Sequence, residues 1–166
     1  MFEKGEYVVY GTKGICVVRE VTTLQLDGTN KDRLYYMLCP LGQKDSKIFV
    51  PVDSNKTRMR RVISREEAGN LIHRIPDIQE ITLENEKLRE ETYKQCLRSC
   101  DCSELVRVIK TLNVRMNQRT AAGKKVTATD ERYFRMAEDS LYSELSLALD
   151  IPKDDMEKYI ASQIEA

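Results

Sequence analysis

The sequence predicts an α+β protein in which a small SH3- or Tudor-like β-barrel is followed by an all-α helical bundle. In the first 62 residues, short runs rich in Val, Ile, Tyr and Phe alternate with turn residues, a pattern typical of strands. From Ser64 onward, apolar residues recur every three or four positions, as they do along helices. With 166 residues, 41% of them hydrophobic, the chain can bury one sizeable core or two small ones.

Five short strands are expected in the first part of the chain. They are predicted at Tyr7–Tyr10, Ile15–Val21, Leu34–Leu38, Lys47–Val52 and Met59–Val62. Turn residues separate them at Gly11–Gly14, Asp27–Asn30 and Gly42–Asp45. A closed or strongly curled sheet would hide most edges of so few strands, which favours a barrel.

About five helices are expected in the second part. Ser64 and Glu67 fit a capping box that begins a short helix, and Pro76 ends it near Ile75. Further helices are predicted at Glu84–Arg98, at Ser103–Arg119, at Thr127–Asp150 and from Pro152 onward. Apolar stripes on these helices predict a bundle. We therefore expect a β domain at 1–62, a short helix and linker at 63–83, and a helical domain at 84–166.

Composition and the N-terminus favour a cytoplasmic protein without membrane association. Apolar runs fall far short of the roughly 20 residues that span a bilayer. Glu3, Lys4 and Glu6 stand where a signal peptide would have its apolar stretch. The five cysteines are an odd number and fit no small disulfide framework, so reduced thiols are expected.

Residues with the potential for catalysis or metal binding are few. The single histidine, His73, fits a surface or helix-end position. Cys96, Cys100 and Cys102 have a spacing that could in principle hold zinc, but no second pair follows. Cys96 and Cys100 are four positions apart, so two buried thiols on one helix are the simpler interpretation. No glycine-rich phosphate loop occurs. We therefore expect no catalytic residue, metal or cofactor, and a binding or scaffolding protein.

One segment is strongly basic although the formal charge of the chain is zero. Residues 105–129 hold six Lys and Arg and no Asp or Glu. A solvated helix face would explain such a run, but the absence of acids also creates a positive field that attracts nucleic acid phosphates without base specificity.

Five segments together form a recognisable pattern: Met1–Tyr10 (MFEKGEYVVY), Gly14–Val18, Phe49–Val52 (FVPV), Val106–Leu112 and Ala137–Leu145. In these segments the chain resembles the CarD/CdnL family of bacterial transcription factors, in particular its clostridial-type members. The resemblance spans essentially the whole chain, and its most specific parts are the opening element and the Val-Pro near position 50.

The resemblance implies that the Tudor-like domain binds the β subunit of RNA polymerase by strand addition. The partner-facing strand corresponds to Lys47, Ile48, Phe49, Val50 and Pro51. Strand alternation predicts that Lys47 and Phe49 point outward, whereas Ile48 and Val50 could simply face the core. Phe49 is therefore the preferred contact.

The resemblance also implies that the helical domain contacts promoter DNA at the upstream edge of the transcription bubble. Family members carry a tryptophan wedge there, but this chain has no Trp and offers Thr82 and Leu83 instead. The expected phosphate contacts are Arg89, Lys94, Arg107, Lys110, Arg115, Arg119, Lys124 and Lys125.

These inferences predict a non-catalytic regulator that shifts the balance between closed and open promoter complexes. The alternative is a protein-protein adaptor that binds through its β domain and makes no DNA contact. The sequence leaves open whether the effect is activation or repression, and whether the chain is a monomer or a strand-paired dimer.

Overall fold

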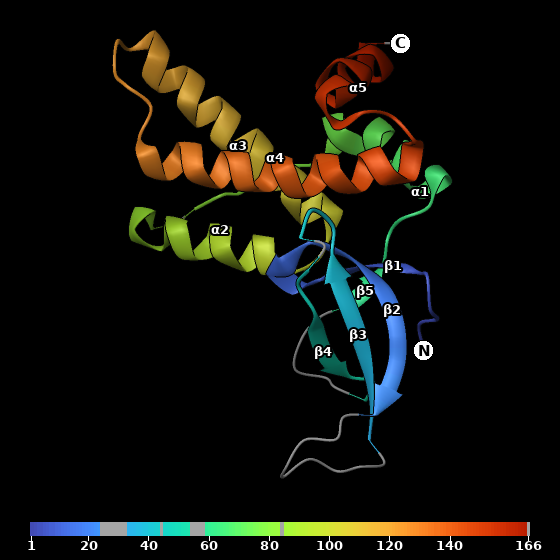
Figure 1. Cartoon of the computed structure of the whole chain (residues 1–166). Coiled ribbons are helices and arrows are strands. Elements are labelled where there is room, and N and C mark those ends of the chain that lie inside the picture. Colours follow the sequence, from blue (N-terminus) through green and yellow to red (C-terminus); the bar gives the residue numbers. More distant parts are fainter. Residues whose placement is uncertain (24–32, 44, 54–58, 84, 166) are drawn as a thin grey trace. The chain divides into compact units, whose positions relative to one another are not determined.

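A computed structural model describes residues 1–23, 33–43, 45–53, 59–83 and 85–165. The chain divides into two compact units, Met1–Val62 and Ile63–Ala166. Strands make up the first unit and helices the second, which confirms the predicted α+β class (Figure 1). The turn predicted at Asp27–Asn30 lies outside the described residues.

The first unit is a five-stranded antiparallel sheet with the order β4-β3-β2-β1-β5. Its strands are β1 (Tyr7–Tyr10), β2 (Ile15–Thr23), β3 (Leu34–Pro40), β4 (Ile48–Pro51) and β5 (Met59–Arg61). Each predicted strand is confirmed, with ends that differ by at most two residues. One face buries the core, which consists of Val8, Cys16, Val18, Tyr36, Leu38 and Val50. In the described part of the sheet, β4 and β5 are the two edge strands.

The second unit is built from five α-helices in its described residues. They are α1 (Arg65–Arg74), α2 (Arg89–Arg98), α3 (Cys102–Ala121), α4 (Ala128–Leu149) and α5 (Met156–Glu165). The capping box is confirmed, because Ser64 Oγ accepts from Glu67 N and Glu67 Oε1 accepts from Ser64 N, both at 3.1 Å. Fully buried residues such as Leu112, Leu145 and Met156 form the core between the helices.

The helix predicted at Glu84–Arg98 starts later than its charge pattern suggests. A 3₁₀ turn, η3 (Glu86–Leu88), comes first, and α2 begins only at Arg89. The Asn85 side chain accepts a hydrogen bond from Lys87 N at 3.0 Å. Asparagine competes with the helix for backbone donors in this way, so it favours the start of a helix over its interior.

The segment between α1 and α2 is fastened to α3. Lys110 Nζ donates to the carbonyl oxygens of Ile75 at 2.8 Å and Ile78 at 2.6 Å. Further along, Ile81 N donates to Thr111 Oγ1 at 2.9 Å. Because Ile75, Ile78 and Ile81 also pack on the helical core, residues 63–83, expected as a short helix and linker, fold with the helical unit.

Candidate functional site

Strand β4 presents an aromatic side chain at the edge of the sheet. Lys47 and Phe49 are exposed, Ile48 is half-buried and Val50 is buried. The alternation predicted from the sequence is therefore confirmed. Phe49 keeps 41% of its surface exposed, which is unusual for a large aromatic side chain.

The hydrogen-bonding register shows which backbone groups of β4 face outward. Val52 N donates to Leu34 O at 3.0 Å, and Val50 lies opposite Tyr36. In an antiparallel pair every second residue bonds to the same neighbour, so Val50 points its backbone groups toward β3, and Phe49 and Pro51 point theirs away. No strand pairs with that outer side within the described residues.

Pro51 limits what this outer edge can bind. Proline has no N–H, so at position 51 the edge offers only a carbonyl acceptor. Phe49 offers both a donor and an acceptor together with its exposed ring. A partner strand therefore finds one complete pairing position at Phe49 and an interrupted ladder at Pro51.

Two of the arginines predicted to contact DNA, Arg89 and Arg115, bind one buried acid. Asp130 is fully buried in the first turn of α4. Arg89 Nη1 pairs with its Oδ1, and Arg115 Nε donates to its Oδ2 at 2.9 Å. Arg115 also reaches Glu86 on η3, with Nη1 and Oε2 3.4 Å apart. These contacts join η3 and the starts of α2 and α4 to α3.

Other predicted phosphate ligands also have partners inside the helical unit. Arg107 pairs with Glu104 at 3.1 Å, and Lys94 pairs with Glu90 at 3.9 Å. Lys110 binds the carbonyl groups that follow α1. Basic residues of the acid-free run thus pair with acids that lie outside the run in sequence. Contact between these basic residues and DNA stays a prediction.

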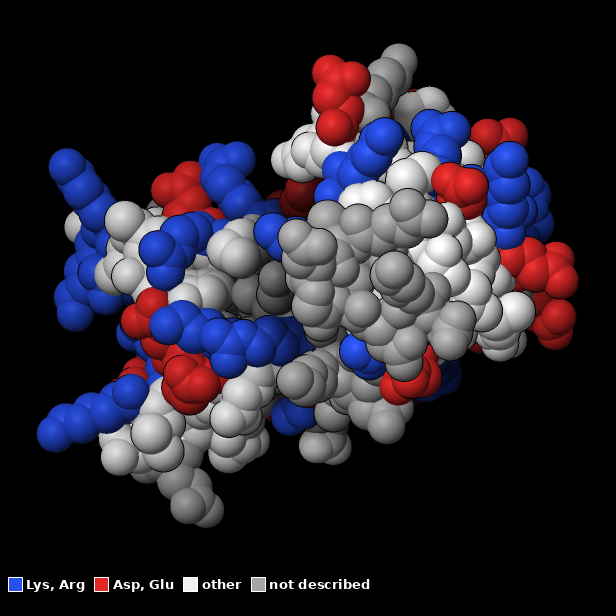
Figure 2. All heavy atoms as spheres, turned by 60° about the horizontal axis from the view of Figure 1, so that its bottom comes forward, with Lys and Arg blue, Asp and Glu red and all other residues white. Residues whose placement is uncertain are grey.

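The turn between α3 and α4 leaves two lysines accessible. Lys124 and Lys125 are exposed, and no acidic side chain pairs with them within the described residues. Arg119 Nε donates to Lys125 O at 2.9 Å, which fixes the turn. Gly123 adopts φ +76°, a conformation that glycine takes without strain. On the face drawn in Figure 2, Lys and Arg side chains are interspersed with Asp and Glu.

The predicted wedge position has a second apolar candidate. Thr82 is exposed, but Leu83 is half-buried. Leu88, on η3, leaves 57% of its surface exposed, more than most other large apolar residues of the described chain. Leu88 is not among the residues predicted from the sequence to contact DNA. Its signal was present, because no apolar residue lies three or four positions away from it within residues 84–92.

The structure also places the cysteines. Cys96 and Cys102 are buried, and their thiols donate to Glu104 Oε2 at 3.2 Å and Glu144 Oε1 at 3.3 Å. Burial, together with the Glu104 carboxylate, raises the pKa of Cys96 to about 12. Cys100 does not lie on the predicted helix, because α2 ends at Arg98, and it adopts φ +60°. Within the described residues, no cluster of His, Cys, Asp or Glu could hold a metal ion.

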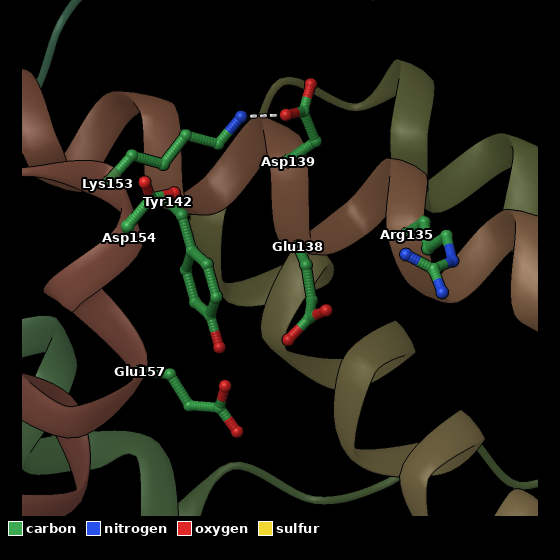
Figure 3. Close-up of a pocket in the computed structure, with 7 residues that line it drawn as sticks. All are labelled: Arg135, Glu138, Asp139, Tyr142, Lys153, Asp154 and Glu157. Atoms are coloured by element: carbon green, nitrogen blue, oxygen red, sulfur yellow. Dashed lines mark hydrogen bonds and ion pairs between the residues drawn. The ribbon is translucent and has the colours of Figure 1, made fainter.

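A cleft of about 500 Å³ lies between α4 and the start of α5 (Figure 3). Lys153 pairs with Asp139 on one side, and the Tyr142 hydroxyl points toward the carboxylates of Glu138 and Glu157. Burial raises the pKa of Glu138, and the negative charge of Glu157 adds to the rise. Among the described residues, none that lines this cleft is a His, Ser or Cys.

The comparison with protein families agrees with the two-unit fold. Residues 2–63 match the CarD-like/TRCF RID domain, a Tudor-like domain, and residues 70–161 match the CarD C-terminal domain. Both domains define the class of RNA polymerase-interacting transcription regulators. The chain belongs to the CarD family. No curated protein matches it, and the family models do not distinguish clostridial-type members, so that finer assignment stays a prediction. Within the described residues, no helix is long and apolar enough to cross a membrane.

Proposed function

We propose that this protein is a non-catalytic, cytoplasmic regulator that binds the RNA polymerase β subunit by strand addition and contacts promoter DNA at the upstream edge of the bubble. The observation that carries the proposal is the outer side of β4, where Phe49 presents an exposed ring and two backbone groups that pair with no strand among the described residues. An incoming strand gains affinity from main-chain hydrogen bonds and specificity from side-chain contacts. Lys47, Ile48, Phe49, Val50 and Pro51 remain the proposed contact strand.

Strand addition can be tested separately from simple packing on the Phe49 ring. Phe49→Ala removes the ring, whereas Phe49→Pro also removes the outward N–H without touching a donor used by β3. Tyr7→Ala is a matched control, because Tyr7 is 42% exposed but lies on β1, an inner strand. Capture of the polymerase β subunit from cell extract should fall with Phe49→Ala, fall further with Phe49→Pro and stay unchanged with Tyr7→Ala. Equal capture by all three variants would contradict strand addition at β4.

The DNA part of the proposal rests on the accessible lysines of the α3–α4 turn. Lys124 and Lys125 are exposed, and the neighbouring Arg119 holds the turn that carries them. Each phosphate neutralised contributes roughly −0.9 to the log-log salt slope of duplex binding. Changing both lysines to Gln should make the log-log salt slope for binding to a forked promoter duplex shallower by at most about 1.8, which is about 0.9 for each lysine.

An adaptor without DNA contact is the second candidate. It is favoured by one observation, that Arg89, Lys110 and Arg115 bind groups of the protein itself. An adaptor would capture polymerase through β4 yet leave the lifetime of open promoter complexes unchanged. A regulator must change that lifetime, because a ligand shifts an equilibrium only by binding its two states differently. Open-complex lifetime with and without the protein therefore separates the two functions.

A further inference from the structure

We propose that Asp130 is a positioning residue: it holds Arg89 and Arg115 so that residues 85–89 present Leu88 to promoter DNA, and these two arginines act inside the protein instead of on phosphates. This inference rests on the proposed DNA contact. Thr127 and Asp130 have the spacing of a capping signature, but no sequence pattern pairs Asp130, which stands immediately after the acid-free run, with Arg89 or Arg115.

The geometry around Asp130 joins three helices at one carboxylate. Its Oδ1 forms an ion pair with Arg89, the first residue of α2, and its Oδ2 forms one with Arg115, in the middle of α3. The side chain of Asp130 is fully buried, and that of Arg89 is only 16% exposed. The Arg89 guanidinium also lies 5.9 Å from the centre of the Tyr93 ring. A guanidinium enclosed in this way has little surface left for a phosphate.

The local backbone places Asp130 at the N-terminus of α4. Thr127 caps α4, and its Oγ1 accepts from Asp130 N at 3.1 Å. Asp130 therefore lies in the first turn of α4, where the helix dipole stabilises negative charge. Two arginines and a helix N-terminus compensate one buried carboxylate, so the cluster is satisfied without an external anion.

The same cluster fixes the turn that carries Leu88. Glu86 lies 3.4 Å from Arg115 Nη1 and 3.9 Å from Arg89 Nε, so η3 is bound to the arginines that Asp130 holds. Further upstream, Thr111 and Lys110 attach residues 75–81 to α3. Leu88 is thus an exposed apolar side chain on a turn that ion pairs hold against α3. An apolar wedge needs such support, because insertion between base pairs works against stacking.

Asp130→Asn tests the proposal, with Glu144→Gln as a matched control. Glu144 is the other buried acid of α4, but it accepts from Ile63 N and Cys102 Sγ, which lie outside residues 85–89. In the full-length protein, Asp130→Asn should speed amide exchange at residues 86–89 and weaken binding to a forked promoter duplex by about tenfold. Glu144→Gln should change neither, although both variants lower the melting temperature.

Salt dependence separates positioning from direct phosphate contact. Arg115→Gln should weaken duplex binding while the log-log salt slope stays that of the wild type. A slope shallower by about 0.9 would assign Arg115 to a phosphate and overturn the inference. Tighter duplex binding by Asp130→Asn would also overturn it, since released arginines would then be free to bind phosphates.

The outcomes distinguish this inference from the proposed function. If the wild type does not bind the forked duplex, the proposed DNA contact fails, and the presentation of Leu88 to DNA fails with it. If the wild type binds and both Asp130→Asn and Glu144→Gln bind equally well, the positioning role alone is refuted. Unchanged exchange at residues 86–89 in Asp130→Asn refutes it as well.

Discussion

Replacing Lys110 by Met tests whether this lysine is a structural residue or a phosphate ligand. Methionine keeps most of the apolar stem but loses the ammonium group, which donates to Ile75 O at 2.8 Å and Ile78 O at 2.6 Å. A third carbonyl, that of Pro76, lies at 3.4 Å and adds little. A hydrogen bond to a charged group contributes about 1.5–3 kcal/mol. Ile75 and Ile78 are half-buried, and water can reach their carbonyls after the change, so the expected loss is about 2 kcal/mol in total.

The measurement is urea unfolding followed by circular dichroism at 222 nm, which reports on the helical unit. Lys124→Met is the control, because Lys124 is exposed and should change the free energy of unfolding by less than about 0.5 kcal/mol. Amide exchange at Ile81 should also accelerate in Lys110→Met. If Lys110→Met unfolds like the wild type and instead makes the salt slope for DNA binding shallower, Lys110 is a phosphate ligand and the structural assignment is wrong.

Three further predictions follow from the capping box and the shifted pKa values. Ser64→Ala should lower the free energy of unfolding by about 1 kcal/mol in urea titrations, because the first turn of α1 loses its acceptor for Glu67 N. Glu138→Gln should raise the melting temperature at pH 7. The pKa of Glu138 is raised in the folded protein, so ionised Glu138 destabilises the fold at pH values above that pKa. Below about pH 4.5 the carboxyl is protonated in both the folded and the unfolded state, and the gain in melting temperature should vanish. Burial raises the pKa of Cys16 to about 11 and that of Cys96 to about 12. At pH 8 both thiols should therefore react with iodoacetamide more slowly in the folded protein than in the protein unfolded by urea. The fold should lose stability as the pH rises above about 9, because the unfolded thiols ionise there and the buried ones do not.

Local patterns predicted the elements well because the signals that define them lie within a few residues. The capping box at Ser64 and the outward Phe49 both follow from short-range rules, and both are confirmed. The late start of α2 shows the limit of such rules. A dense run of Glu, Lys and Arg indicated helix from Glu84, but the Asn85 side chain captures the donor of Lys87 and a 3₁₀ turn forms first.

Long-range electrostatics could not be predicted from the sequence. The acid-free run suggested a free basic face, yet within it Arg115 binds Asp130 across 15 positions and Lys110 binds Ile75 across 35. Sequence spacing identifies charge partners three or four residues apart, as for Glu104 and Arg107, but not partners that packing brings together. The proposed binding surface is therefore smaller than the basic composition suggests.

The missing donor of Pro51 also bears on how the protein behaves when it is abundant. An edge strand with donors and acceptors along its whole length can pair with the edge strands of further identical chains and so form a fibre. At β4 the second outward position cannot donate, so a polymer of identical chains would lack one rung at every junction. We expect the proline to favour pairing with a single short strand over open-ended stacking of identical chains, which would keep the protein from polymerising at high concentration.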